Sequence, residues 1–156
     1  MTSFRQYAGL LDTKDEKILK LLVADGRKSV VEISEELSLP RATVQERLKR
    51  LVDSGTIRKF VAIPDYSRIG RQVTAYIFVS FRSEGSLSQR NLAEDVSKIP
   101  GVYEVAVISG EWDILVKVRA GSVEEIGGLV VDRLRAMKGI EKTETCVAFQ
   151  TIKESF

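Results

Sequence analysis

The sequence predicts an α+β chain in two parts, an N-terminal winged helix-turn-helix and a C-terminal ferredoxin-like βαββαβ sandwich. Three observations lead to this prediction. Residues 38–59 read as a helix with one apolar stripe, followed by a glycine and a short basic run. Two shorter amphipathic segments precede this helix, and a strand-helix-strand pattern occurs twice after it.

Composition limits the classes of function. The 156 residues, 44% hydrophobic and 29% charged, suit a globular protein with one large domain or two small ones. No apolar run approaches the ~20 residues of a membrane span, and no signal segment is recognisable, so we expect a cytoplasmic protein without a membrane partner. Histidine is absent, and we expect the single cysteine, Cys146, to be a small core residue in a strand. We therefore predict no catalytic residue, no metal ligand and no cofactor.

Charge divides the chain. Residues 1–63 contain 12 Lys and Arg against 9 Asp and Glu, a net charge of +3, whereas the remainder has a net charge of −1. A turn-forming run that starts at Pro64, together with Gly70, marks the change. We expect a helix-turn-helix domain at 1–63, a linker at 64–72 and a βαββαβ domain at 73–156.

Local signals place the first helices. Asp12 should begin the first helix and Gly26 should follow its end. The expected buried stripe of this helix is Ile18, Leu19, Leu22 and Val23. Ser29, with Glu32 three residues later, has the spacing of a capping box and should begin a short second helix. Pro40 has no amide proton and suits the start of the third helix.

The third helix concentrates positive charge. Its apolar stripe, within about a third of the circumference at 100° per residue, is Val44, Leu48, Leu51 and Val52. Residues 38–59 contain six cations and two anions, a local net charge of +4 in a chain whose total is +2. Attraction to phosphates requires such a concentration, so we expect double-stranded DNA as a partner. The alternative is a three-helix bundle that does not contact DNA.

The helix-turn-helix geometry assigns roles to these side chains. Residues at the start of a recognition helix reach base edges in the major groove. The candidates for reading bases are Arg41, Thr43, Gln45 and Glu46. The candidates for phosphate contacts are Arg47, Lys49, Arg50, Arg58 and Lys59. A structural salt bridge is almost as good an interpretation for Arg47, and the last two cations belong to an expected β-hairpin, the wing, at residues 56–63.

The C-terminal part should contain strands near residues 73–82, 102–109, 113–119 and 140–151, with both intervening helices on one sheet face. Tyr76 and Phe78 alternate onto the opposite face. We expect this apolar face to form a homodimer interface, and a monomer is the alternative. A Gly127-Gly128 pair inside the second helix, which costs about 1 kcal/mol per glycine, indicates close packing or a local kink.

The order and spacing of these motifs resemble the Lrp/AsnC, or feast/famine, family of transcriptional regulators. The motifs are L-D-x-x-D-x-x-I-L from Leu11, V-x-x-R-L-x-x-L-x-x-x-G-x-I from Val44, and G-x-W-D from Gly110. The resemblance covers nearly the whole chain from about Leu11. It implies a sequence-specific DNA-binding regulator, not an enzyme, that dimerises through its C-terminal sheets, often assembles into an octamer, and binds an amino-acid effector between dimers.

The same resemblance implies an effector site of unknown ligand identity. Its residues would be Gly110, Glu111, Trp112, Asp113, Thr143 and Thr145. Asp113 would accept hydrogen bonds from an ammonium group, and the threonines would supply hydroxyl groups. The alternative for residues 109–113 is a plain β-turn, with Gly110 at positive φ and Asp113 in a turn hydrogen bond.

Two other classes of function remain open. A hydrolase that uses Asp113 and Lys117 would have no histidine, metal cluster or phosphate loop to assist it. An architectural protein that wraps DNA without responding to a metabolite is the closer alternative, and it would show broad sequence tolerance.

Overall fold

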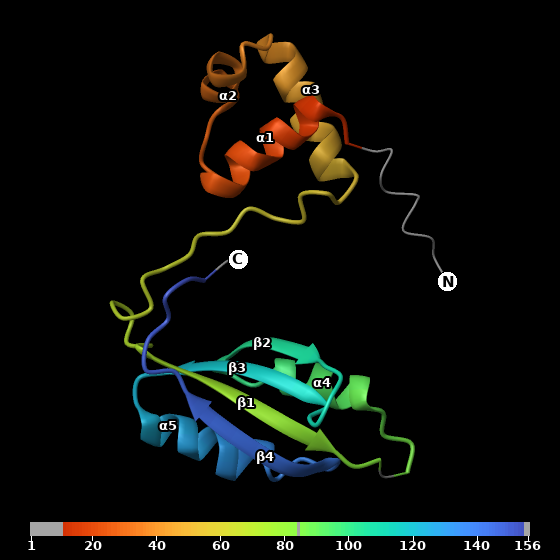
Figure 1. Cartoon of the computed structure of the whole chain (residues 1–156), viewed down its shortest axis with the longest axis vertical. Coiled ribbons are helices and arrows are strands. Elements are labelled where there is room, and N and C mark those ends of the chain that lie inside the picture. The colour runs from red at the N-terminus through yellow and green to blue at the C-terminus, as the bar shows by residue number, and fades with distance from the viewer. Residues whose placement is uncertain (1–10, 84, 155–156) are drawn as a thin grey trace. The chain divides into compact units, whose positions relative to one another are not determined.

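The computed structural model describes residues 11–83 and 85–154. The chain divides into two compact units, Met1–Ile63 and Pro64–Phe156 (Figure 1). Each unit has its own hydrophobic core. None of the helices in the described ranges is long and apolar enough to cross a membrane.

The first unit is helical. Its helices are α1 (Thr13–Ala24), α2 (Val30–Leu37) and α3 (Arg41–Asp53). Ser29 and Glu32 form the predicted capping box of α2. Asp12 caps α1, and Asp15 completes a second capping box there by accepting a bond from the Asp12 amide. These short-range bonds satisfy the amides that a helix start leaves without partners.

The helices enclose a small apolar core. Its buried members are Ile18, Leu22, Ile33, Val44, Leu51 and Ile57. The prediction that Val23 and Val52 are buried is wrong, since Val23 is 77% exposed and Val52 is 44% exposed. Leu21 packs against the core on α1, where we expected Val23. In α1 and α3 the buried face therefore differs from the predicted stripe by one residue each.

The expected wing hairpin is not formed within this chain. Residues 54–72, all of which the structure describes, contain no strand. Ile57 is buried and its amide donates to the Leu51 carbonyl at 2.9 Å, but Phe60, Val61 and Ile63 are each more than half exposed. Residues 56–63 contain no Gly, Asn or Asp, the residues that a tight hairpin turn favours.

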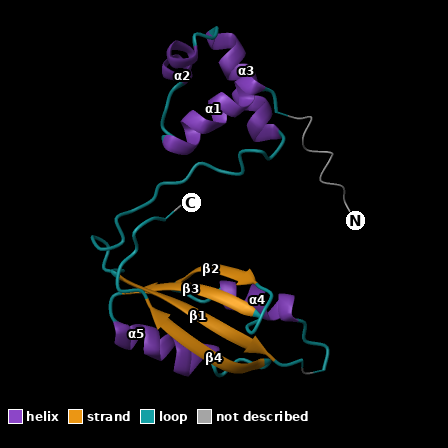
Figure 2. Cartoon of the chain, in the orientation of Figure 1, coloured by secondary structure: helices purple, strands orange, loops and turns teal. Residues whose placement is uncertain are grey.

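The second unit is a layer of helices on a sheet (Figure 2). Its elements are β1 (Val73–Phe81), α4 (Gln89–Ser97), β2 (Val102–Val107), β3 (Ile114–Ala120), α5 (Val123–Gly128), the π-helical segment η2 (Leu129–Leu134) and β4 (Ile140–Val147). The strands lie antiparallel in the order β2-β3-β1-β4, which is the predicted ferredoxin-like arrangement. The second and fourth strands end earlier than expected, at Val107 and Val147.

Both helices cover one face of this sheet, as predicted. Leu92 and Val96 of α4, Ile126 of α5, and Ile77 and Val116 of the sheet belong to one buried cluster. The opposite face, which we call the open face, is the one without helices.

The glycine pair does not serve close packing. A Cβ atom on Gly127 would meet nothing within 4 Å, and one on Gly128 would approach only the Asp132 carboxylate, at 3.6 Å. The α-helix instead changes into the π-helical segment at the next residue, Leu129. Of the two interpretations offered by the sequence, the local irregularity is the one observed.

The predicted linker packs on the second unit. The Tyr66 ring meets the Tyr103 ring edge to face, with centroids 5.2 Å apart. The Gln72 side chain donates to the Gly121 carbonyl at 2.5 Å. Residues 64–72 therefore form part of the second compact unit.

Candidate nucleic-acid interface and effector site

One ridge of α3 presents polar side chains to solvent. Arg41, Gln45 and Lys49 follow each other at four-residue intervals and all are exposed. Arg41 lies 4.0 Å from Glu35, a loose contact between two exposed groups. Lys49 makes no ion pair with any residue in the ranges 11–83 and 85–154, and the same holds for Arg58 and Lys59. These cations can meet an anionic partner without breaking an internal contact.

Two other α3 cations are tied to α1. Asp15 is fully buried, and its carboxylate accepts from Arg47 at 2.9 Å and from Arg50 at 2.5 Å. Arg47 also donates to the Asp12 carboxylate at 2.6 Å, and only 18% of its side chain is exposed. The structure therefore favours the salt-bridge interpretation of Arg47. Arg50 differs, because 56% of its side chain remains exposed.

The remaining base-reading candidates differ in exposure. Glu46 is exposed and Thr43 is half-buried. Both belong to the first turns of α3, the part of a recognition helix that reaches base edges.

We expect the Asp12 carboxylate to make the stability of the first unit sensitive to acid. The hydrogen bond from Arg47, with further bonds from the Asp15 and Lys14 amides, lowers the pKa of Asp12 from 3.8 to about 2. A lowered folded-state pKa contributes stability above the unfolded value, and that contribution is lost as the pH falls from about 4 to about 2. Asp12→Asn keeps a capping side chain but not the charge. Thermal melts at a series of pH values should show a weaker loss of stability for this variant across that window, and equal losses would contradict the assignment.

The loop before β3 is a closed turn. The Ile108 amide donates to the Asp113 carbonyl at 2.9 Å, and Gly110 has a φ of +124°, a value that L side chains rarely adopt. The Asp113 carboxylate accepts from the Phe81 amide at 2.8 Å, and its carbonyl accepts from Gln89 at 2.7 Å. Both features of the plain-turn interpretation are present, and Asp113 is already engaged by the backbone of β1.

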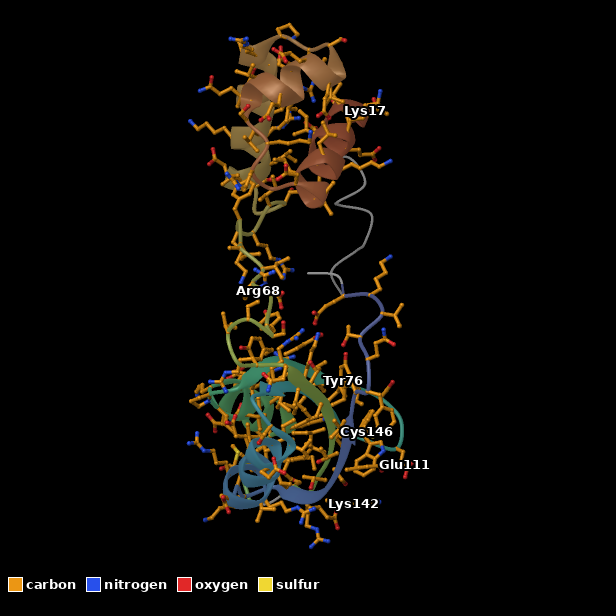
Figure 3. All side chains as sticks on the ribbon, turned by 90° about the vertical axis from the view of Figure 1, so that its left-hand side faces the viewer. Lys17, Arg68, Tyr76, Glu111, Lys142 and Cys146 are labelled. Atoms are coloured by element: carbon orange, nitrogen blue, oxygen red, sulfur yellow. The ribbon has the colours of Figure 1, made fainter. Side chains whose placement is uncertain are left out.

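Side chains of this loop reach the open face. The Trp112 ring lies 6.0 Å from that of Phe78, and the Lys142 ammonium lies 4.7 Å from the Trp112 centroid. Figure 3 shows Glu111 and Lys142 on the same side of the sheet as Tyr76. Glu111 is exposed.

The two threonines lie on the other face of the sheet. Thr143 and Thr145 pair with Val79 and Ile77, which face the helices. Asp113 bonds to Val79 from the opposite side, so Asp113 and Thr143 are two strand spacings apart, roughly 10 Å. Thr143 accepts a 3.0 Å hydrogen bond from Arg135. The predicted effector residues thus form two groups separated by β1.

Comparison with known proteins finds a matching family model for each of the two units. The family model described as "Lrp/AsnC ligand binding domain" matches residues 74–156, and the one described as "Winged helix-turn-helix DNA-binding" matches residues 11–58. An HTH-type transcriptional regulator of Pyrococcus abyssi is 44% identical over 94% of this chain and 98% of its own length. The HTH-type transcriptional regulator FL11 of Pyrococcus horikoshii is 35% identical over 93% of both chains.

This chain belongs to the Lrp/AsnC family. It is a DNA-binding transcriptional regulator with a ligand-binding domain, and the members of its family are regulators rather than enzymes. The crystal structure of a Neisseria meningitidis transcriptional regulator in complex with L-Met superposes with a TM-score of 0.87 at 29% identity, covering 93% of this chain and 94% of the other. The AsnC family regulator of Agrobacterium tumefaciens, at 23% identity, has the same fold with a TM-score of 0.86 and covers 93% of this chain and 94% of its own.

The open face of this Lrp/AsnC chain is more charged than its sequence suggested. Lys117 and Arg119 are 9% and 7% exposed, and both form ion pairs with Glu154. The Arg119 guanidinium stacks 3.7 Å from the Tyr66 ring centroid. Burial, with the nearby Arg119 charge, lowers the pKa of Lys117.

Cys146 also lies on the open face. It pairs with Tyr76 in the β1–β4 register and is exposed, so the prediction that it is a core residue is wrong. Figure 3 places it close to Tyr76.

Three charged residues lie next to a predicted effector residue, Thr143, and were not predicted from the sequence. Arg135, Glu141 and Lys142 adjoin Thr143 in the structure. The glycine pair at residues 127–128 was the one sequence signal near them, because it precedes the π-helical segment that ends at Leu134, next to Arg135. In the described ranges, no group of three or more His, Cys, Asp or Glu side chains is placed to hold a metal ion.

Proposed function

We propose that this chain is a sequence-specific transcriptional regulator whose DNA affinity is controlled by an amino-acid effector bound between dimers. The observation that carries the DNA part is the exposed ridge of Arg41, Gln45 and Lys49 on α3. Arg47 and Arg50 connect α3 to α1, which supports a rigid presentation of this ridge.

Side chains at the start of α3 are proposed to read sequence. Arg41 suits a bidentate contact with guanine, and Gln45 suits one with adenine. Thr43 and Glu46 complete the base-facing set, with Glu46 able to accept from cytosine. Each good pair contributes about 1 to 3 kcal/mol of discrimination. Lys49, Arg58 and Lys59 are proposed to contact phosphates, and Arg50 does so with the exposed part of its side chain.

The effector is proposed to be an α-amino acid. The family model for residues 74–156 is that of a ligand-binding domain, and the neisserial structure was determined with L-Met. L-methionine is therefore the first ligand to test. Gly110, Glu111, Trp112, Asp113, Thr143 and Thr145 remain the proposed contacts, although Asp113 would have to share its carboxylate with the Phe81 amide.

The assembly is proposed to be a homodimer that associates further, for example into an octamer. Tyr76 and Phe78 on the open face are only half-buried within one chain, which supports the use of this face between two copies. A dimer would present two α3 helices to half-sites about one or two helical turns apart.

The DNA proposal is tested by the salt dependence of duplex binding. Lys49→Ala should weaken binding to all sequences similarly and reduce the slope of log K against log salt by about 1, because one phosphate contact is lost. Lys17→Ala makes the same charge change on an exposed position of α1 and should leave the slope nearly unchanged. Fluorescence anisotropy with a labelled promoter fragment measures both. Equal slopes for wild type and Lys49→Ala would remove Lys49 from the interface.

A further inference from the structure

A hollow lies beside β4, separate from the turn at residues 109–113. Its volume is about 290 Å³. Its lining residues are Arg135, Ile140, Glu141, Lys142 and Thr143. β4 is the last strand in the sheet order, so in the described structure one of its edges has no neighbouring strand. The hollow therefore has a strand edge on one side and the end of a helix on the other.

The helix that ends at this hollow has an unusual turn. The Arg135 amide donates to the Val130 carbonyl, five residues earlier, at 2.9 Å. Ile126, Val130 and Leu134 recur every four residues, and each is at most 5% exposed. Ile126 lies in the α-helix, where residues four apart share a face, and Val130 and Leu134 lie in the π-helical segment that continues it. Arg135 follows directly, and its Nε donates to Thr143 Oγ1 at 3.0 Å.

The strand on the other side of the hollow is irregular as well. Ser80 pairs with Lys142 and Phe81 pairs with Ile140, which leaves Glu141 as an extra residue in β4. Bulges redirect side chains, and both bulges and π-helical turns are enriched at functional sites. The glycine pair that precedes the π-helical segment is not needed for packing. Two irregularities thus meet at one surface hollow.

The charges at this hollow match those of a zwitterion. The terminal nitrogens of Arg135 make no ion pair with the residues of 11–83 and 85–154. Glu141 provides a carboxylate, which is held by an ion pair with Arg82. Lys142 lies over the Trp112 ring, so its ammonium group is directed to the turn at residues 109–113. A guanidinium group is the side chain best shaped for two parallel hydrogen bonds to a carboxylate.

We propose that this hollow is the subsite for the charged end of the effector, in which Arg135 binds the α-carboxylate and Glu141 faces the ammonium group. Thr143 positions Arg135 through its hydrogen bond. The assignment rests on the proposed function, since it requires that the chain bind an amino acid. It gives the ammonium group a partner other than Asp113, whose carboxylate is bonded to the Phe81 amide.

Calorimetric titration of the full chain tests this assignment. L-methionine and then the other proteinogenic L-amino acids are titrated into wild type, followed by the α-amide of each one that binds. Arg135→Ala should raise the Kd of a binding amino acid roughly 10- to 100-fold, since a charge-assisted bidentate contact is lost. Arg133→Ala removes another exposed positive charge two residues away and should leave the Kd unchanged.

The amide separates a direct contact from an indirect one. It lacks the carboxylate, so it should bind wild type weakly and should bind Arg135→Ala no more weakly than wild type. An unfolding midpoint of Trp112 fluorescence equal to that of wild type shows that the second unit of Arg135→Ala is folded. If an amino acid binds wild type and Arg135→Ala equally well, the subsite is wrong while the proposed function stands. If no amino acid binds wild type, the proposal of control by an amino-acid effector is wrong, and the proposed subsite is wrong as well.

Discussion

Replacing Asp15 with alanine should destabilise the first unit by about 3 kcal/mol and abolish DNA binding at ordinary salt concentrations. The Asp15 carboxylate is fully buried and joins the start of α1 to Arg47 and Arg50 of α3. Removing Asp15 takes away the carboxylate that pairs with Arg50 and leaves Arg47 paired with Asp12 alone. The helix α3, which presents Arg41, Gln45 and Lys49, would then lose its hydrogen bonds to Asp15 of α1.

Two spectroscopic signals make this result specific. Chemical denaturation followed by far-ultraviolet circular dichroism should show an earlier transition of the N-terminal helices. Trp112, the single tryptophan, lies in the second unit, so its fluorescence transition should keep its midpoint. Glu16→Gln, an exposed change one residue away, should shift stability by less than about 0.5 kcal/mol. Equal midpoints for Asp15→Ala and wild type would show that the cluster does not hold α1 and α3 together.

Replacing Gly139 with alanine should destabilise the second unit by roughly 2 to 4 kcal/mol. Gly139 precedes β4 with a φ of +86°, which costs energy for any residue with a Cβ atom. The added Cβ would also lie 2.6 Å from Leu87 Cδ2 and 3.1 Å from Phe81 Cε2, so these two side chains must shift. Trp112 fluorescence should report the loss, whereas the transition of the N-terminal helices should not move.

Gly127→Ala provides the matched control. Gly127 lies in α5, and its added Cβ would meet nothing within 4 Å. Alanine should therefore stabilise the second unit by about 1 kcal/mol through its higher helix propensity. A loss of stability at Gly127 equal to that at Gly139 would show that backbone conformation and close contacts are not what distinguishes the two positions.

Features that depend on neighbours in sequence were predictable. The capping box of Ser29 and Glu32 joins residues three apart, and the βαββαβ order follows from alternating periodicities. The face on which Cys146 lies was not predictable, because the extra residue Glu141 shifts the register of β4. A shift of one residue moves every following side chain to the other face of a strand.

The candidate sites divide in the same way. Motif spacing placed the proposed base-reading residues on α3 and located the turn around Gly110, because each set occupies one short segment. Arg135 was not found, because its partner Thr143 belongs to a different element and a π-helical turn brings them together. The wing was predicted from β-prone residues alone, without the turn residues that a hairpin favours.

By itself, the sequence determined the order of the elements, the helix caps, the concentration of cations near α3 and the resemblance to the Lrp/AsnC family. Tertiary structure decided which cations remain available, because the bonds that engage Arg47 and Arg50 reach an aspartate 32 and 35 residues away. Helix periodicity records which residues share a face, but the ion pairs between α1 and α3 form only when folding brings these two segments within about 4 Å of each other. That is why Lys49 and Arg50 are adjacent in sequence yet differ in their contacts.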